Sequence, residues 1–161
     1  MPRSAHRHSV GAERTYPDYP VLAVGAVVVR DGKVLLVLRG REPGRGLWSL
    51  PGGGVHPGET LRAAVVRELR EECGIEVAVA ETAEVVERMI PDTEGRVQYH
   101  YVILDYQAQW LQGELAASEE VEDARWVDPG SLHQYHMTRG TADVICRLLA
   151  RRNGEVQDLG G

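Results

Sequence analysis

Hydrophobic positions divide the chain into short apolar runs, which predict β-strands, and one four-residue periodicity, which predicts an α-helix. The run from Val21 to Val29 is almost entirely apolar, as is typical of a buried strand. Asp31-Gly32 is a strong signal for a two-residue hairpin, so Lys33 to Arg39 is the predicted partner strand. A further short strand is predicted from Leu47 to Leu50, and the sequence Pro51 to Gly54 is predicted to end it.

The first predicted helix runs from Thr60 to Cys73. Apolar residues recur every four positions between Leu61 and Cys73, which gives the segment one apolar stripe. Gly74 suits the left-handed position that follows the end of many helices.

The second half of the chain predicts three strands and a final helix. The predicted elements are strands from Val77 to Arg88, Arg96 to Gln107 and Asp123 to Val127, an acidic loop from Leu111 to Val121, and a helix from Thr141 to Arg152. Strands and helices are mixed without a regular βαβ alternation. This order indicates an α/β or α+β sandwich around a mixed sheet.

Three acidic residues lie at the unfavourable end of the first predicted helix. Glu68, Glu71 and Glu72 fall in its last turns, where the helix dipole disfavours acids by about 0.3–1 kcal/mol each. Glu68 and Glu72 are also a like-charged i,i+4 pair. The final helix is charged conventionally, with Asp143 in its first turn and Arg147 towards its end. The contrast predicts that a cation, most simply a metal ion, lies against the three acids.

The residues around these acids point to phosphate chemistry. Carboxylate oxygens suit hard cations, and Mg²⁺ shares its coordination shell readily with substrate phosphates. The preceding glycines, Gly52 to Gly54, allow close backbone approach to a ligand. Arg67 lies one turn before Glu71 and is placed to orient it. Together these residues predict a divalent-metal site that binds a phosphate-containing substrate.

Length, charge and cysteine content narrow the class of protein. The 161 residues predict a single domain, and the net charge of −6 argues against general binding of nucleic acid or membranes. No apolar run approaches the ~20 residues of a membrane span, and residues 1–20 lack the apolar core of a secretory signal. Cys73 and Cys146 are expected to be reduced core thiols. A cytoplasmic protein is therefore expected.

The central stretch resembles the Nudix box, G-x5-E-x7-R-E-U-x-E-E-x-G-U, where U is a bulky aliphatic residue. Every fixed position is matched, by Gly53, Glu59, Arg67, Glu68, Leu69, Glu71, Glu72, Gly74 and Ile75. The resemblance implies a Nudix hydrolase with an α/β/α sandwich and a mixed β-sheet whose edges are mostly antiparallel. The expected organisation is a flexible N-terminal arm (1–16), one Nudix domain (17–154) and a flexible tail (155–161).

The resemblance also implies roles for individual residues. Glu68, Glu71 and Glu72 would bind Mg²⁺ or Mn²⁺, the Gly52 carbonyl would join them, and Arg67 would hold the carboxylates in place. Glu59 would be a structural or outer partner of this group.

The implied reaction is attack by water on a phosphorus of a diphosphate bridge. Its general base would be a box glutamate or a residue of the acidic segment Glu119 to Glu122. Glu120 is the favoured candidate for an extra metal ligand or base, and a merely solvated acidic loop is the alternative. Arg39, Gly53 and Gly54 are candidates for binding substrate, although Arg39 also fits an ordinary surface arginine.

The Nudix box does not identify the group attached to the nucleoside diphosphate. ADP-ribose or a related sugar nucleotide is slightly favoured, because some relatives that act on it carry a proline where Pro91 lies, sixteen residues after Ile75. An ordinary Pro-Asp turn explains Pro91 equally well. The alternatives are nucleoside triphosphates, including oxidised ones, and a non-catalytic nucleotide-sensing domain. The expected partner is a small nucleotide, without duplex nucleic acid or membrane, and a homodimer is possible.

Overall fold

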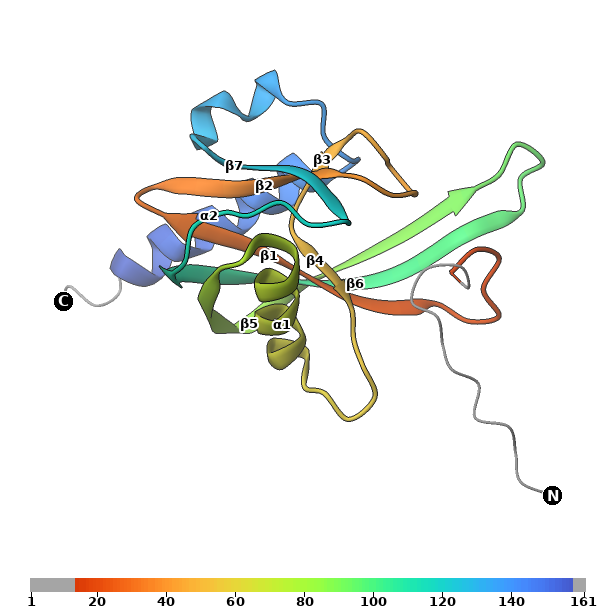
Figure 1. The fold of residues 1–161 in the computed structure, drawn as a ribbon, viewed down its shortest axis with the longest axis horizontal. Helices are drawn as coiled ribbons and strands as arrows, with labels where there is room; N and C mark the ends of the chain where they lie inside the picture. The colour runs from red at the N-terminus through yellow and green to blue at the C-terminus, as the bar shows by residue number, and fades with distance from the viewer. Residues whose placement is uncertain (1–13, 158–161) are drawn as a thin grey trace.

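The computed structural model describes residues 14–157 of the chain (Figure 1). The elements are β1 (Val21–Arg30), β2 (Lys33–Arg39), β3 (Trp48–Ser49), β4 (Gly52–Gly54), α1 (Leu61–Cys73), β5 (Glu76–Pro91), β6 (Val97–Gln112), β7 (Val121–Val127), the 3-10 helix η1 (Pro129–Gln134) and α2 (Thr141–Gln157). No helix within this part of the chain is long and apolar enough to cross a membrane.

A single mixed sheet contains all seven strands. The main order is β3-β2-β1-β6-β5, with β4 paired to β1 and β7 paired to β2. The central pair, β1 and β6, is parallel, whereas all the other strand pairs are antiparallel. The predicted mixed sheet with antiparallel edges is therefore confirmed.

The two long helices cover opposite faces of the sheet, as the alternation of side chains along β1 requires. Val24, Ala26 and Val28 pack in one buried cluster with the apolar stripe of α1. Val27 and Val29 lie in a second cluster with residues of α2, of which Val144, Ile145 and Leu148 are buried. The result is an α/β/α sandwich, with α1 and α2 on the two sides of the sheet in Figure 1.

Local signals explain where α1 begins and ends. The Thr60 hydroxyl accepts a hydrogen bond from the backbone N–H of Ala63, which satisfies one of the free donors of the first turn. Gly74 has φ 71° and ends the helix in the left-handed conformation, which a glycine adopts without steric cost. The helix predicted from Thr60 to Cys73 is thus confirmed, with Thr60 as its cap.

The glycine stretch was predicted only in part. Strand β3 ends before Pro51, as predicted, but Gly52–Gly54 then forms β4, which pairs with Ala23, Val24 and Gly25 of β1 and was not predicted. A side chain at Gly52 would place its Cβ 2.1 Å from the Val24 carbonyl oxygen. Only glycine therefore allows the two backbones to lie this close.

Other boundaries moved outwards because tertiary pairing extends the strands beyond their apolar runs. β5 and β6 are antiparallel strands of 16 residues each: β5 continues past Arg88 to Pro91, and β6 continues past Gln107 to Gln112. β7 begins at Val121 instead of Asp123. The 3-10 helix η1 was not predicted; the Asp128 side chain caps it by accepting from the Gly130 N–H. Cys73 is buried as expected, whereas Cys146 is exposed, contrary to the expectation of a core thiol.

The two ends of the described chain extend into the segments predicted as arm and tail. The backbone N–H of Tyr16 donates to the Gln98 carbonyl at 2.7 Å, and its hydroxyl donates to Asp92 at 2.8 Å. Both partners belong to the β5–β6 hairpin region. At the other end, α2 continues to Gln157. Residues 1–13 and 158–161 lie outside the described residues, and the predicted domain limits stay a prediction.

Candidate metal centre and substrate cavity

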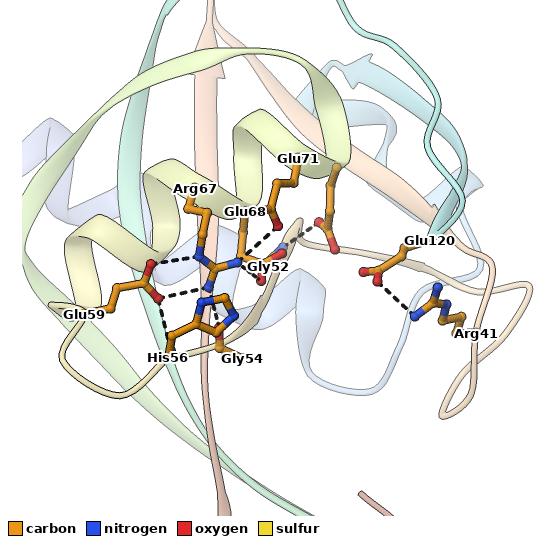
Figure 2. A network of polar contacts seen from close by, with 10 residues as sticks. Arg41, Gly52, Gly54, His56, Glu59, Arg67, Glu68, Glu71 and Glu120 are labelled. Carbon is orange, nitrogen blue, oxygen red and sulfur yellow. Dashed lines mark hydrogen bonds and ion pairs between the residues drawn. The ribbon is translucent and has the colours of Figure 1, made fainter. Parts of the chain in front are cut away.

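Three carboxylates from two distant parts of the chain converge beside α1 (Figure 2). Glu68 and Glu72 come from the last turns of the helix and are only 7% and 8% exposed. Glu120 comes from the loop before β7 and points towards them. One carboxylate oxygen from each residue lies within 4.8 Å of those of the other two. The spacing along α1 and the closure of a remote loop together create this acidic cluster.

The Arg67 guanidinium connects the cluster to its surroundings (Figure 2). Its Nε and Nη2 donate to both oxygens of Glu59, at 2.8 and 3.0 Å. Nη1 donates to Glu68 at 2.8 Å and to Glu71 at 3.2 Å, while Nη2 also donates to the Gly54 carbonyl at 2.8 Å. The rigid Arg67 guanidinium thus holds Oε1 of Glu68, and this contact orients the whole carboxylate.

Strand β4 forms the opposite wall of the cluster. The backbone N–H of Gly52 donates to Glu72 at 3.0 Å. A Cβ at Gly53 would lie 2.5 Å from Oε1 of Glu68, so only a glycine leaves room for this carboxylate. The glycines therefore bring the backbone directly against the acids, as the sequence indicated.

Burial makes the two helix carboxylates difficult to ionise. Desolvation raises the pKa of Glu72 to about 8; the Gly52 hydrogen bond opposes this shift, while the charges of Glu68 and Glu120 add to it. Desolvation also raises the pKa of Glu68, against the lowering effect of Arg67. The opposite holds for Glu59, whose hydrogen bonds from Arg67 lower its pKa to about 2.

The other residues predicted to bind the metal differ in their contacts and exposure. Glu71 is outside the group of three and exposed, and Arg67 is its ion-pair partner. Glu120 is paired with Arg41 at 2.9 Å, and both side chains are close to half exposed. The Gly52 carbonyl was the expected metal ligand, but the contact described for Gly52 is that of its N–H with Glu72.

The donor set fits a divalent cation. Two buried carboxylates and a third that faces them supply the hard oxygen ligands that Mg²⁺ and Mn²⁺ prefer. Without a cation, the burial of Glu68 and Glu72 raises the pKa of each, so a positive ion would relieve a real electrostatic cost. Arg67 does not remove this cost, because it contacts Glu68 and not Glu72.

The acidic cluster opens onto a cavity of about 1240 Å³. Its walls include Val24 and Val37 from the core cluster beside α1, and Val86 and Val144 from the cluster beside α2. Besides the cluster, its walls contain Arg39 at the end of β2, as predicted, and Gly53 and Gly54 of β4. They also contain Arg88, Asp105 and Arg139, which the sequence did not single out. A volume of this size accommodates a nucleotide-sized ligand.

One signal in the sequence could have identified Arg88. Every second residue of β5 faces the same side, and Val86, Arg88 and Ile90 all line the cavity. Arg88 is thus a charged residue on an otherwise apolar strand face. Asp105 is 6% exposed and lies over Gly25, whose missing side chain leaves it room. Arg139 precedes α2 in a loop, and no local pattern distinguishes it from other loop arginines.

These features define a class of protein: an α/β/α sandwich in which a glycine strand and an acidic helix form a metal-type carboxylate centre beside a nucleotide-sized cavity. Comparison with known families agrees, because the family model described as the NUDIX domain matches residues 19–148. The chain therefore belongs to the Nudix hydrolase family.

Individual relatives point in the same direction. The chain is 36% identical over 114 residues to an ADP-ribose pyrophosphatase from Methanocaldococcus jannaschii, covering 71% of this chain and 65% of that protein. It is 33% identical over 136 residues to a CTP pyrophosphohydrolase from Escherichia coli, covering 84% and 96% of the two chains. A MutT NUDIX hydrolase from Burkholderia pseudomallei superimposes with a TM-score of 0.66 at 34% identity, over 80% of this chain and 97% of that one.

Proposed function

We propose that the protein is a divalent-metal-dependent pyrophosphohydrolase that cleaves the diphosphate bridge of a nucleoside diphosphate derivative. The observation that carries this proposal is the convergence of Glu68, Glu72 and Glu120 at one end of a nucleotide-sized cavity. A carboxylate cluster of this kind offers the oxygen ligands of a divalent metal, and the adjoining cavity offers space for the nucleotide whose phosphates the metal would contact.

The residues that would hold the metal are Glu68, Glu72 and Glu120, with the Gly52 carbonyl and Glu71 as further ligands. A bound Mg²⁺ or Mn²⁺ would lower the pKa of the attacking water and neutralise charge on the phosphate oxygens. Arg67 keeps Glu68 and Glu71 oriented through its donor fork.

The hydrolytic step forms a new bond between the water oxygen and phosphorus and breaks the bridging P–O bond. A carboxylate accepts the proton lost by the water, and the bridging oxygen leaves with the departing phosphate. Glu120 is our candidate for this base because it faces the helix carboxylates and is close to half exposed. Arg39 and the backbone of Gly53 and Gly54 would contact the phosphates of the substrate.

ADP-ribose or a related sugar nucleotide is the first candidate substrate. The archaeal relative is named an ADP-ribose pyrophosphatase, and Pro91, at the end of β5, occupies the position that suggested this substrate from the sequence. Nucleoside triphosphates, including oxidised ones, are the second candidate. They are favoured by the E. coli relative named for CTP and by the arginines of the cavity.

A substrate panel tests the proposal. ADP-ribose, nucleotide sugars, dinucleoside polyphosphates, CTP, dNTPs and oxidised dGTP are supplied with Mg²⁺ or Mn²⁺, and the release of nucleoside monophosphate is followed. We expect turnover of at least one nucleoside diphosphate derivative, with cleavage within the phosphate chain. Well-folded protein that binds a nucleotide but turns over none of the panel would support a sensing domain instead.

A further inference from the structure

Besides Arg14, Arg41 and Arg67, three further arginines line the cavity. Arg39 ends β2, Arg88 lies on β5 and Arg139 lies in the loop before α2. The Arg39 Nε donates to the Pro43 carbonyl at 2.7 Å, which fixes the side chain without neutralising it. Elements from three parts of the chain therefore bring guanidinium groups to one cavity.

The three positive charges act on one another. The pKa of Arg88 is lowered, first by its burial and then by the charges of Arg39 and Arg139. Arg39 and Thr138, the residue before Arg139, also lie against the same glycine: a Cβ at Gly44 would be 3.4 Å from Arg39 Nε and 3.1 Å from Thr138 Cγ2.

Nearby carboxylates neutralise the positive charges of Arg88 and Arg139 only in part. Within the described part of the chain, no carboxylate lies within ion-pair distance of Arg88 or Arg139. Asp105 does favour the charged form of Arg88 from a greater distance. However, burial raises the pKa of Asp105 to about 7, so this group is only partly ionised at neutral pH.

Most of the other arginines in the described part of the chain have carboxylate partners. The paired residues include Arg30, Arg41, Arg67, Arg70, Arg96, Arg125 and Arg147. In a chain with a net charge of −6, acidic groups are plentiful. Like charges gathered in a cavity without such partners therefore indicate an anionic ligand, just as acids at a helix C-terminus indicate a cation.

We propose that Arg39, Arg88 and Arg139 form a second anion site, separate from the metal cluster, which holds a terminal phosphate group of the substrate. The guanidinium group matches phosphate because its planar fork donates two hydrogen bonds to two oxygens. This inference rests on the proposed function and adds a feature of the substrate: a phosphate group beyond the bridge that is cleaved. Such a group is either the third phosphate of a nucleoside triphosphate or a phosphate carried by the sugar of a sugar nucleotide.

Binding of inorganic phosphate to the metal-free protein tests the site without any turnover. Titration calorimetry in the presence of EDTA compares wild type with Arg88→Gln, Arg139→Gln and the control Arg70→Gln, whose arginine is paired with Glu76 outside the cavity. We expect each cavity variant to weaken phosphate binding about 10- to 100-fold, the range of one charged hydrogen-bonding group, and the control to bind as wild type. Wild type that binds no phosphate, or variants that bind it equally well, would overturn the proposal.

Thermal unfolding separates a ligand site from a structural role. Removing one of several repelling charges should leave the Tm of the ligand-free variants unchanged or raise it, while abolishing the increase in Tm that phosphate produces in wild type. Arginines required for packing would instead lower the Tm without ligand, and that result would count against the site. Since Arg139 is exposed, Arg139→Gln tests the proposal even if Arg88→Gln does not fold.

Kinetics then identify the source of the phosphate. We measure kcat/KM for two pairs of substrates and take the ratio within each pair. The pairs are CTP with a CDP-linked alcohol, and 5-phosphorylated ADP-ribose with ADP-ribose. Arg88→Gln should lower one of these ratios about 10- to 100-fold, and the affected pair names the phosphate. Equal losses for all substrates would place these arginines on the diphosphate bridge and overturn a separate site. Arginine-dependent phosphate binding without any turnover would retain the site and refute the proposed function.

Discussion

Glu72 is the residue on which the local electrostatics depend most. It is 8% exposed at the C-terminal end of a helix, and the Gly52 N–H donates a hydrogen bond to it. Its neighbours Glu68 and Glu120 both make its ionisation harder. A carboxylate kept in such a position is unfavourable for the metal-free fold, and a function that requires its charge explains its presence.

Replacement of Glu72 by glutamine should therefore not destabilise the metal-free protein. Its pKa is about 8 in the folded state and near the ordinary 4.5 when unfolded, so folding becomes less favourable as pH rises from 4.5 to 8. Glu72→Gln removes this loss and keeps an oxygen that accepts from Gly52. Urea unfolding with EDTA should show equal stability of the two proteins at pH 4.5 and greater stability of the variant at pH 8.

The matched control is Glu94→Gln, an exposed glutamate in the β5–β6 turn, which should follow the wild-type pH dependence. A variant clearly less stable than wild type at pH 8 without metal would mean that Glu72 serves the fold and not a cation.

Metal binding should depend on pH for the same reason. Below pH 8 the folded protein holds a proton on Glu72, and a metal must displace it. The affinity for Mn²⁺ or Mg²⁺ should then rise about tenfold per pH unit between roughly pH 5 and 7, if one proton is released. Calorimetry in buffers of different ionisation enthalpy measures both the affinity and the proton count, and a flat profile without proton release would contradict the assignment.

At the scale of elements, the centre depends on the contact between α1 and the glycine strand β4. Helix α1 supplies two carboxylates and Arg67, while β4 supplies backbone at a distance that only glycine permits. Arg67 also donates to the Gly54 carbonyl, so the two elements are joined by a charged hydrogen bond. Their relative position therefore determines the position of the carboxylates.

A side chain on β4 should disturb this arrangement directly. In Gly53→Ala the new Cβ would meet Glu68 at 2.5 Å, and the carboxylate or the strand must move. We expect the affinity for Mn²⁺ to fall at least about tenfold, with an overpacking cost of about 1–3 kcal/mol in unfolding free energy. Calorimetry and urea unfolding measure the two effects, and unchanged metal affinity would show that β4 does not shape the site.

The elements that could be predicted from the sequence are those with local signals. Helix α1 was predicted with its start and its stop, because Thr60 and Gly74 act on their own neighbours; the structure adds that Thr60 is the cap. Strand β4 was missed, since a run of glycines carries no side-chain pattern and becomes a strand only through its pairing with β1. The extra length of β5 and β6 likewise comes from their mutual pairing.

The residues of the site likewise fall into two groups: those that local spacing predicts and those whose position depends on the tertiary structure. Glu68 and Glu72 are i,i+4 neighbours, so their meeting follows from helix geometry alone. The position of Glu120 depends on how a remote loop closes, and the sequence supported it only as a candidate. Glu71 also belongs to the box and lies exposed beside Arg67, so its role as a ligand stays a prediction.

At the scale of the whole molecule, one cavity joins the acidic centre to the arginines. The carboxylates of α1 and the three arginines line the same cavity, whose walls come from both core clusters of the sandwich. β4, paired to the central strand β1, also lines this cavity. A substrate that spans both regions would place phosphates against the acids through a metal and the rest of the molecule among the arginines. The oligomeric state, which the sequence left open, is not tested by the structure. β5 is the last strand in the order of the sheet, and its side chains Val85 and Met89 are exposed.

The measurement that tests the central claim most directly is the metal dependence of turnover in wild type and Glu72→Gln, with the best substrate of the panel. The account predicts no cleavage in EDTA, cleavage restored by Mg²⁺ or Mn²⁺, and a kcat at least about 10²-fold lower in the variant, the scale of one lost catalytic electrostatic contact. Cleavage that persists in EDTA, or a variant as active as wild type, would contradict it.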